Sequence, residues 1–241
     1  MICDFDCKIF NVNKLELFDG ASDKEYLRER FKSDLTILDN CSIHRLVHYV
    51  DHKDHQSVSA TLSNVASTKT FIDQMIDKDF TKRFKIKVYP RIFLSRNCPY
   101  IINISRLSIG STRRIFIELP LSLNTDDLDE ALNKILYNCH LVPVFTNFHA
   151  VSSLYSPEYI DKLIRIRGVG FVFSIFNVND SLNLKLIEQI IKNGNTVLLG
   201  TSAEHSRMNE NEINKNLSYL KKKLSPEHYR DILISSGRLF E

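Results

Sequence analysis

The sequence predicts one α/β domain in which parallel strands, separated by helices, form a closed or nearly closed barrel. Short apolar runs rich in Ile, Val, Phe and Leu alternate with amphipathic stretches along the 241 residues. The composition, 43% hydrophobic and 25% charged, is that of an ordinary globular chain. No linker, repeat or low-complexity tract divides residues 1–241, so a single domain is expected. An open doubly wound sheet is the alternative architecture.

Seven apolar runs predict strands that are buried on both faces, as in a parallel sheet. They are Ile2–Phe10, Ile43–Val50, Phe84–Phe93, Ile115–Leu119, Leu141–Thr146, Gly168–Phe176 and Thr196–Gly200. Because helical stretches separate the runs, the strands are expected to be parallel and joined by right-handed crossovers. In either architecture, a functional site should lie at the carboxyl ends of the strands.

Helices are predicted between the runs from apolar periodicity and from capping residues. The first carries an apolar stripe from Leu27 to Leu38, behind a capping box of Ser22 and Glu25. Further starts are predicted at Thr125, Ser156-Pro157 and Ser225-Pro226, and stops at Gly194 and near Gly237. The Ser- and Thr-rich stretch 58–77 is also predicted as a helix.

Charge and cysteine content exclude several classes of protein. A net charge of +3, from 32 basic and 29 acidic residues, is too small to favour nucleic acid or an anionic membrane surface. No run approaches the roughly 18–20 apolar residues of a membrane span. Five widely spaced cysteines without a CxxC pair indicate free thiols in a reducing compartment. The charged N-terminal segment is unlike a signal peptide, so the protein is expected to be cytoplasmic.

Several common catalytic motifs are missing from the sequence. There is no GxxxxGK[ST] or GxGxxG nucleotide loop and no GxSxG serine elbow. No CxxxxxR loop surrounds Cys7 or any other cysteine, so the sequence does not favour cysteine catalysis.

The densest group of metal-ligand residue types is IHRLVHYVDHKDH, with His44, His48, Asp51, His52 and His55. Imidazoles and a carboxylate this close together suit zinc or manganese. The reading that the spacing favours is a strand with His44 and His48 facing outward, followed by a polar loop. Period-2 geometry would then separate the ligands.

A second acidic pair, Asp4 and Asp6, shares one face of the first predicted strand, as a metal-binding pair would. Two exposed aspartates on an edge explain the spacing nearly as well. If a single metal ion binds, its ligand candidates are Asp4, Asp6, Asp19 and His52.

Six fragments follow one another in an order that matches a known family. They are DFDCKIF (Asp4–Phe10), FDGASD (Phe18–Asp23), RIFIELP (Arg114–Pro120), LVPVFTNFHA (Leu141–Ala150), NGNTVLLGTSAEHS (Asn193–Ser206) and SPEHYRDILISSGRLF (Ser225–Phe240). In that order they resemble the D-x-H-x-H-I, D-D-G-A, Y-I-L-I-E-F-P, G-Y-I-P-V-I-A-H-P-E-R, A-S-D-A-H and N-P-x-x-L-L segments of the manganese-dependent tyrosine phosphatases. These enzymes are encoded beside capsule or exopolysaccharide genes in Gram-positive bacteria. The resemblance covers nearly the whole chain and implies the distorted seven-stranded, TIM-like barrel of the polymerase-and-histidinol-phosphatase (PHP) superfamily.

The resemblance also implies a mechanism, in which histidines and carboxylates hold three metal ions. A metal-activated hydroxide attacks phosphorus, and arginines steady the phosphoryl oxygens. In this sequence, Asp6 and Lys8 stand at the positions of the family's first two histidines. Asp19 keeps the aspartate of the D-D-G-A turn. Asp51, with His52 beside it, stands at the histidine after the second strand.

The other metal positions are altered more severely. The metal-bridging glutamate falls at Pro90 or Arg91, and no Asp or Glu lies between Asp79 and Glu118. The ammonium of Lys8 has no lone pair while it is charged, and Arg91 would also repel a nearby divalent cation.

The last two motifs lose their ligands as well. Asn147 replaces the histidine of H-P-E-R, and Ala150 replaces its arginine. The D-A-H pair becomes Ser202 and Glu204, or Glu204 and His205 after a one-residue slip. Neutral oxygen and nitrogen groups at these positions are poor substitutes for imidazole or carboxylate.

These departures predict a pseudophosphatase, a binding or regulatory protein of capsule or exopolysaccharide biosynthesis with a degenerate manganese site and no resident cofactor. The implied partner is a bacterial tyrosine kinase or its tyrosine-rich tail, and Lys8 and Arg91 are hypothesised to hold an anion such as phosphate. A purely structural subunit is a third reading. The alternative is a working manganese-dependent phosphotyrosine phosphatase with a rebuilt site of Asp4, Asp6, Asp19, His52, Glu204 and His205.

Overall fold

The computed structural model describes residues 2–8, 21–53, 55–95, 101–110, 112–121, 125–202 and 208–240. Its strands are β1 (Ile2–Asp4), β2 (Ile43–His52), β3 (Lys85–Phe93), β4 (Arg114–Glu118), β5 (Val142–Phe145), β6 (Gly170–Ser174) and β7 (Thr196–Gly200). The helices are α1 (Ala21–Asn40), α2 (Val58–Met75), α3 (Lys78–Arg83), α4 (Thr125–Asn133), α5 (Phe148–Val151), α6 (Pro157–Arg165), α7 (Ser181–Lys192), α8 (Glu210–Lys223) and α9 (Pro226–Phe240). Short 3₁₀ turns lie at Ile104–Leu107 and Ile175–Asn177, and a π-helical turn at Lys134–Asn138 extends α4.

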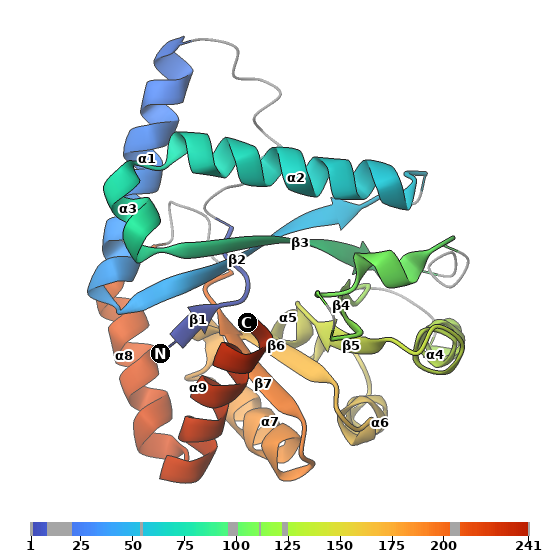
Figure 1. Ribbon diagram of the computed structural model, residues 1–241. Coiled ribbons are helices and arrows are strands. Elements are labelled where there is room, and N and C mark those ends of the chain that lie inside the picture. Colours follow the sequence, from blue (N-terminus) through green and yellow to red (C-terminus); the bar gives the residue numbers. More distant parts are fainter. Residues whose placement is uncertain are drawn as a thin grey trace.

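The described strands form one parallel sheet in which β1 to β7 pair in chain order (Figure 1). The two ends of the sheet meet just beyond β1, where Phe5 N–H donates to the Leu199 carbonyl at 2.8 Å. Ser202 N–H donates to the Asp6 carbonyl at 2.9 Å and extends this closure toward the carboxyl ends. The predicted nearly closed barrel is therefore confirmed, and the open doubly wound sheet is not formed.

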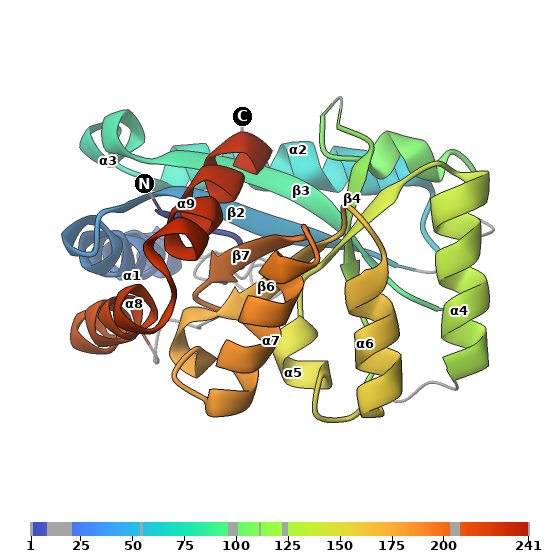
Figure 2. The same ribbon diagram turned by 90° about the horizontal axis from the view of Figure 1, so that it is seen from below.

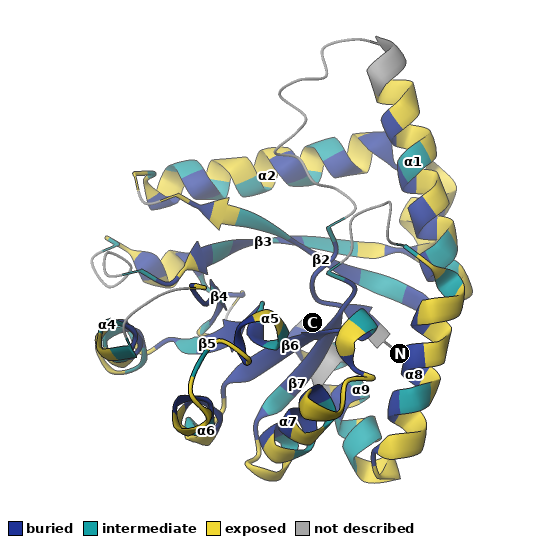
Figure 3. Ribbon diagram, turned by 180° about the vertical axis from the view of Figure 1, so that it is seen from behind, coloured by how far each residue is buried: buried dark blue, intermediate teal, exposed yellow. Residues whose placement is uncertain are grey.

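Helices surround the outside of the barrel, while α9 lies against β1 and β7 (Figure 2). The larger apolar core lies between the strands and this helical layer, and the strands are buried throughout much of their length (Figure 3). A second core fills the barrel interior with strand side chains, among them Val47, Phe116, Val172 and Leu198, together with Phe5 just after β1. Parallel strands covered on both faces require this continuous apolar character.

Most predicted elements are present, with corrections at their ends. The first strand ends at Asp4 rather than Phe10, because the chain bends at Phe5 and Asp6; residues 9–10 lie outside the described part. Helix α1 already includes Ser22, so this residue lies within the first turn. Helix α9 continues through Gly237 to Phe240.

Other helical predictions hold closely. The stretch predicted at 58–77 is α2, and the side chain of Ser57 caps it by accepting from Ala60 N–H. Ser156 caps α6 in the same way, with Pro157 in the first turn. Helix α8 was not predicted. Among the described residues, no helix is both long enough and apolar enough to cross a bilayer.

Candidate functional site at the barrel mouth

The barrel interior changes from aromatic to charged at the carboxyl ends of β2, β3 and β4. Side chains alternate between the two faces of a strand, so residues two apart share a face. The rings of Tyr49 on β2 and Tyr89 on β3 pack in the barrel interior. Asp51 and Arg91 follow them by two residues, so they lie on the same interior face, nearer the mouth. The register of β2 and β3 sets Asp51 directly beside Arg91, and Glu118 ends β4 nearby.

The guanidinium of Arg91 joins the two carboxylates of this level. Its Nε lies 2.7 Å from Asp51 Oδ1, and its Nη2 lies 3.1 Å from Asp51 Oδ2 and 2.8 Å from Glu118 Oε2. The guanidinium carbon also lies 5.3 Å from the ring centre of Tyr49. The arginine side chain is 13% exposed, against 48% for Asp51 and 30% for Glu118. Such forked contacts are the strong form of the ion pair.

Electrostatics within this group favour the charged guanidinium. Burial by itself lowers the pKa of Arg91. The hydrogen-bonded carboxylate of Asp51 and the nearby negative charges of Glu118 and Asp6 outweigh this effect, so the pKa is raised overall. Burial also raises the pKa of Glu118, an effect that the Arg91 charge partly offsets. The mouth thus contains a permanent cation fixed by carboxylates from both neighbouring strands.

Asp4 and Asp6 are both buried, so the interpretation as two exposed aspartates on an edge is wrong. Asp4 Oδ1 accepts from Asp6 N–H at 3.0 Å and from Thr201 N–H at 2.8 Å. Its Oδ2 accepts from the Thr201 hydroxyl at 2.7 Å. Burial raises the pKa of Asp4 to about 6 despite these bonds, which lower it. Asp4 therefore links the chain after β1 to the chain after β7, and helps to close the barrel.

Asp6 lies nearer the mouth and contacts the residue that follows β7. The Ser202 hydroxyl donates to Asp6 Oδ2, and the Lys8 ammonium lies 3.8 Å from the same oxygen. Ser202 adopts a left-handed backbone conformation, with φ of 49°. Gly200 allows this close approach, because a Cβ at Gly200 would lie 2.7 Å from both the Cβ and the backbone nitrogen of Asp6.

The histidines of the 44–55 segment do not converge. His44 Nε2 lies 2.8 Å from Asp39 Oδ1 at the end of α1, and His48 Nδ1 lies 2.9 Å from the Cys7 carbonyl. His52 Nδ1 lies 2.7 Å from the Thr61 hydroxyl on α2. Burial lowers the pKa of His48, which favours its neutral form. The histidines are thus separated, as the strand interpretation expected. That interpretation is wrong in two details, because the strand continues through Asp51 to His52 in place of a polar loop, and His48 is buried.

The described donors do not fit a metal cluster of the kind that the resemblance implies. Within the described ranges, no three His, Cys, Asp or Glu side chains are grouped so that they could hold a metal ion. Asp51 and Glu118 already bind Arg91, and both oxygens of Asp4 accept hydrogen bonds. The predicted site residues Asp19, Glu204 and His205 lie outside the described part of the chain.

Asn147, at the position of the family's H-P-E-R histidine, makes a two-point contact with the backbone. Its Oδ1 accepts from Leu119 N–H at 2.8 Å, and its Nδ2 donates to the Leu119 carbonyl at 2.7 Å. The amide therefore extends the pairing of β4 and β5 by one step. An imidazole could not make both bonds with the same geometry.

Buried thiols also bear on the chemistry of the interior. Burial raises the pKa of Cys3 and of Cys41 to about 11. A thiol with so high a pKa is protonated at neutral pH and is a poor nucleophile. Both thiols are buried and neither forms a disulfide, as expected.

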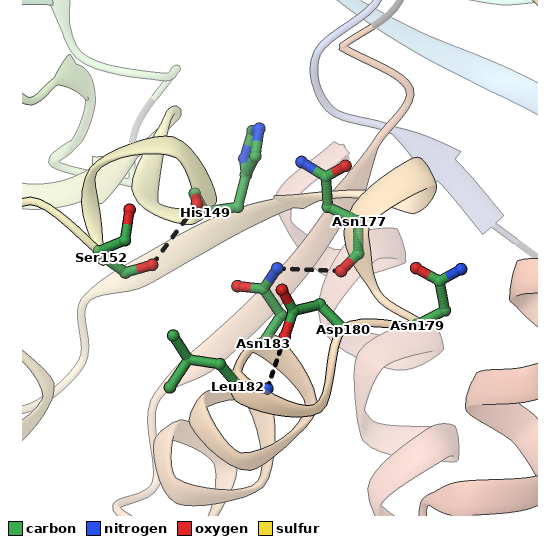
Figure 4. A pocket seen from close by; sticks show the side chains of 8 residues that line it. His149, Ser152, Asn177, Asn179, Asp180, Leu182 and Asn183 are labelled. Carbon is green, nitrogen blue, oxygen red and sulfur yellow. Dashed lines mark hydrogen bonds between the residues drawn. The ribbon is translucent and has the colours of Figure 1, made fainter.

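Sequence reasoning missed a polar cavity of about 360 Å³ beside the mouth (Figure 4). Its lining comes from the segments that follow β5 and β6, and includes His149, Ser152, Asn177, Asn179, Asp180 and Asn183. Burial lowers the pKa of His149, while the charge of Asp6 raises it. The sequence signal was a run of polar residues, Asn177 to Asp180, directly after the sixth apolar strand.

The fold and the position of the charged groups define the class of protein. A parallel barrel with polar groups at the carboxyl mouth is the arrangement that barrel enzymes use for their active sites. No protein-family model matches the sequence, and the curated proteins give no match either.

A solved structure gives a more particular comparison. It comes from the crystal structures of YwqE from Bacillus subtilis and CpsB from Streptococcus pneumoniae, unique metal-dependent tyrosine phosphatases. The similarity has a TM-score of 0.69 and covers 99% of this chain and 94% of that chain, at 14% sequence identity. At this identity the likeness shows the fold alone, and it confirms the single-domain, TIM-like barrel that the sequence predicted.

Proposed function

We propose that this chain is a pseudophosphatase, a catalytically degenerate relative of the metal-dependent tyrosine phosphatases. It would act in the cytoplasm as a binding or regulatory protein of capsule or exopolysaccharide biosynthesis. The observation that carries the proposal is the guanidinium of Arg91 between Asp51 and Glu118. By the sequence resemblance, Arg91 stands at or next to the position of the family's metal-bridging glutamate.

Charge balance explains why this substitution opposes a metal cluster. Closely spaced divalent ions require shared carboxylates to offset their mutual repulsion. Here a cation that is part of the chain binds the carboxylates of both Asp51 and Glu118, and it offsets one of their two negative charges. An arginine stays protonated at any physiological pH, so titration does not free the two carboxylates.

The contacts of Asp4 and His52 support this proposal over a rebuilt phosphatase site. Asp4 binds Thr201 through both carboxylate oxygens, and His52 lies against Thr61 on α2. Two of the six ligands of the alternative site are thus engaged in contacts that hold the barrel together.

We infer that the partner is a tyrosine kinase or its tyrosine-rich tail, docked at the barrel mouth. Lys8 is the cation best suited to meet a phosphotyrosine there. Its side chain is 44% exposed, and its ammonium lies 3.8 Å from Asp6, farther than a direct hydrogen bond. Arg91 is already engaged by two carboxylates and would contribute its charge more than its donors.

The test combines hydrolysis and capture of one phosphotyrosine peptide, in the presence of manganese. We expect turnover at the level of the buffer blank, together with retention of the peptide on immobilised protein. Lys8→Ala should weaken retention by about tenfold, as loss of one charge-assisted contact implies. Lys185→Ala removes an exposed lysine of α7 and should leave retention unchanged.

Two results would contradict the proposal. Manganese-dependent turnover that disappears in Asp19→Ala would favour the working phosphatase with a rebuilt site. Absence of both turnover and retention would favour a purely structural subunit.

A further inference from the structure

The cavity beside the mouth has a buried polar floor and an exposed polar rim. Asn183, at the floor, is 6% exposed, and Ser152 is also buried. Asn177, Asn179 and Asp180 form the exposed rim. The volume of about 360 Å³ lies in the range of small-molecule sites, and the position is at the carboxyl ends of β5 and β6.

Asn183 occupies a position where the helix pattern calls for an apolar residue. The buried residues of α7 are Asn183, Leu186, Ile187 and Ile190, a stripe at helical spacing that faces the barrel. Its Nδ2 donates to the Asn177 carbonyl at 2.9 Å, which fixes the amide orientation. The amide oxygen points the other way (Figure 4), and no described residue donates a hydrogen bond to it.

His149 lines the opposite side of the cavity. Its Nδ1 is buried and has no hydrogen-bond partner among the described residues, so this nitrogen is not open to a molecule in the cavity. A ligand would therefore use the Asn183 amide oxygen rather than this nitrogen. The imidazole and the amide come from the segments after β5 and after β6, respectively (Figure 4).

The charge of the lining limits the ligand. Among the described residues that line the cavity, Asp180 is the one with a formal charge, and none is a Lys or an Arg. Asp180 Oδ1 caps α7 by accepting from Leu182 N–H at 2.7 Å, and no described group donates to its other oxygen. An anion would face this carboxylate without a countercharge. An apolar molecule would leave the amides unpaired.

We propose that this cavity binds a neutral polyhydroxylated ligand, a sugar or polyol unit. Each hydroxyl of such a ligand both donates and accepts, as the amide and carboxylate groups of the lining require. Asn183 Oδ1 and Asp180 Oδ2 accept from the ligand. This proposal does not depend on the pseudophosphatase assignment, because none of these residues belongs to the Arg91 network.

The test exploits the difference between a residue needed for binding and one needed for folding. Asn183→Leu restores the apolar stripe of α7, so we expect unchanged or higher stability together with loss of binding. The matched control is Asn195→Ala, at the amino end of β7. The buried amide of Asn195 makes two hydrogen bonds: its Oδ1 accepts from Gly168 N–H, and its Nδ2 donates to the Ile164 carbonyl. This control should lose about 1–2 kcal/mol of stability and keep its binding.

Binding is measured by ligand-observed NMR with the methyl glycosides of glucose, galactose and N-acetylglucosamine, and with glucose 1-phosphate as the anionic probe. We expect at least one neutral glycoside to bind, weakened about tenfold or more in Asn183→Leu. Three outcomes would overturn the proposal. They are no neutral glycoside bound, equal binding by Asn183→Leu, or binding of the phosphate ester alone. Retention of the phosphotyrosine peptide should be the same in wild type and Asn183→Leu.

Discussion

At the scale of single residues, ion pairs and hydrogen bonds determine which side chains of the barrel mouth are available to a ligand. The sequence resemblance places the family's metal-bridging glutamate at Pro90 or Arg91, but it does not predict the partners of Arg91. Glu118 was absent from the predicted site, because it reaches Arg91 from the adjacent strand, two residues beyond Phe116, the register partner of Arg91. Asp4 was interpreted either as half of a metal-binding pair or as an exposed edge residue. It is buried because the chain bends after β1 and closes on Thr201, a contact between positions 197 residues apart.

The Arg91 network should contribute measurably to stability. In Arg91→Met, the carboxylates of Asp51 and Glu118 face each other without a cation, and we expect a loss of about 2 kcal/mol. Urea unfolding at pH 7 provides the measurement. The matched control is Arg83→Met, which removes an exposed arginine paired with Asp39 and should cost less than about 1 kcal/mol. Equal losses in the two variants would contradict a special role for Arg91.

Asp4 should give the protein a pH-dependent stability. Burial raises its pKa from 3.8 to about 6, so the folded state binds this proton more tightly than the unfolded state. The resulting stabilisation is complete below pH 3.8 and is lost as the pH rises through about 6. At 1.36 kcal/mol per pH unit, the loss is on the order of 3 kcal/mol.

Asp4→Asn isolates this titration. The amide can accept from the backbone of Thr201 and Asp6 through one atom and donate to the Thr201 hydroxyl through the other. Unfolding free energies of both proteins, measured from pH 4 to pH 7, should converge or cross, because only the wild type loses this contribution. A difference that stays constant over the whole range would refute the account of Asp4.

At the scale of elements, apolar runs and caps located most strands and helices. The seven apolar runs correspond to β1 to β7 because strands buried on both faces must be apolar throughout. Helix α8 was missed because its apolar positions, Ile213, Leu217 and Leu220, are interrupted by charged residues and by the buried Asn216. The polar cavity was missed because no local pattern reveals that the segments after β5 and β6 face each other.

Closure between the two ends of the sheet should depend on Gly200. In Gly200→Ala, the new Cβ would lie 2.7 Å from Asp6 backbone and side-chain atoms, so β7 must move away from the chain after β1. We expect a loss of about 2 kcal/mol or more, measured by thermal or urea unfolding. Gly237→Ala, within α9, is the control. A Cβ at Gly237 would lie 3.8 Å from Arg45 Nη1, which is an ordinary van der Waals contact. Helix propensity should make that variant up to about 1 kcal/mol more stable.

At the scale of the whole molecule, the barrel and its active-site end could be predicted, but the chemistry there could not. Strand and helix alternation leads to a parallel barrel, and barrel geometry gathers the strand ends at one mouth. Whether the groups gathered there bind a metal or one another depends on contacts between distant strands. The ion pairs of Arg91 with Asp51 and with Glu118 are of this kind, and together they form an ion-pair network at the mouth.

The most direct test of this account is the manganese content of the whole protein, purified without chelator and dialysed against manganese. Because Arg91 already occupies the carboxylates of Asp51 and Glu118, we predict far less than one manganese ion per chain. Its melting temperature should be the same in manganese and in a chelator. Stoichiometric manganese, with a melting temperature that falls when the metal is removed, would contradict the central claim.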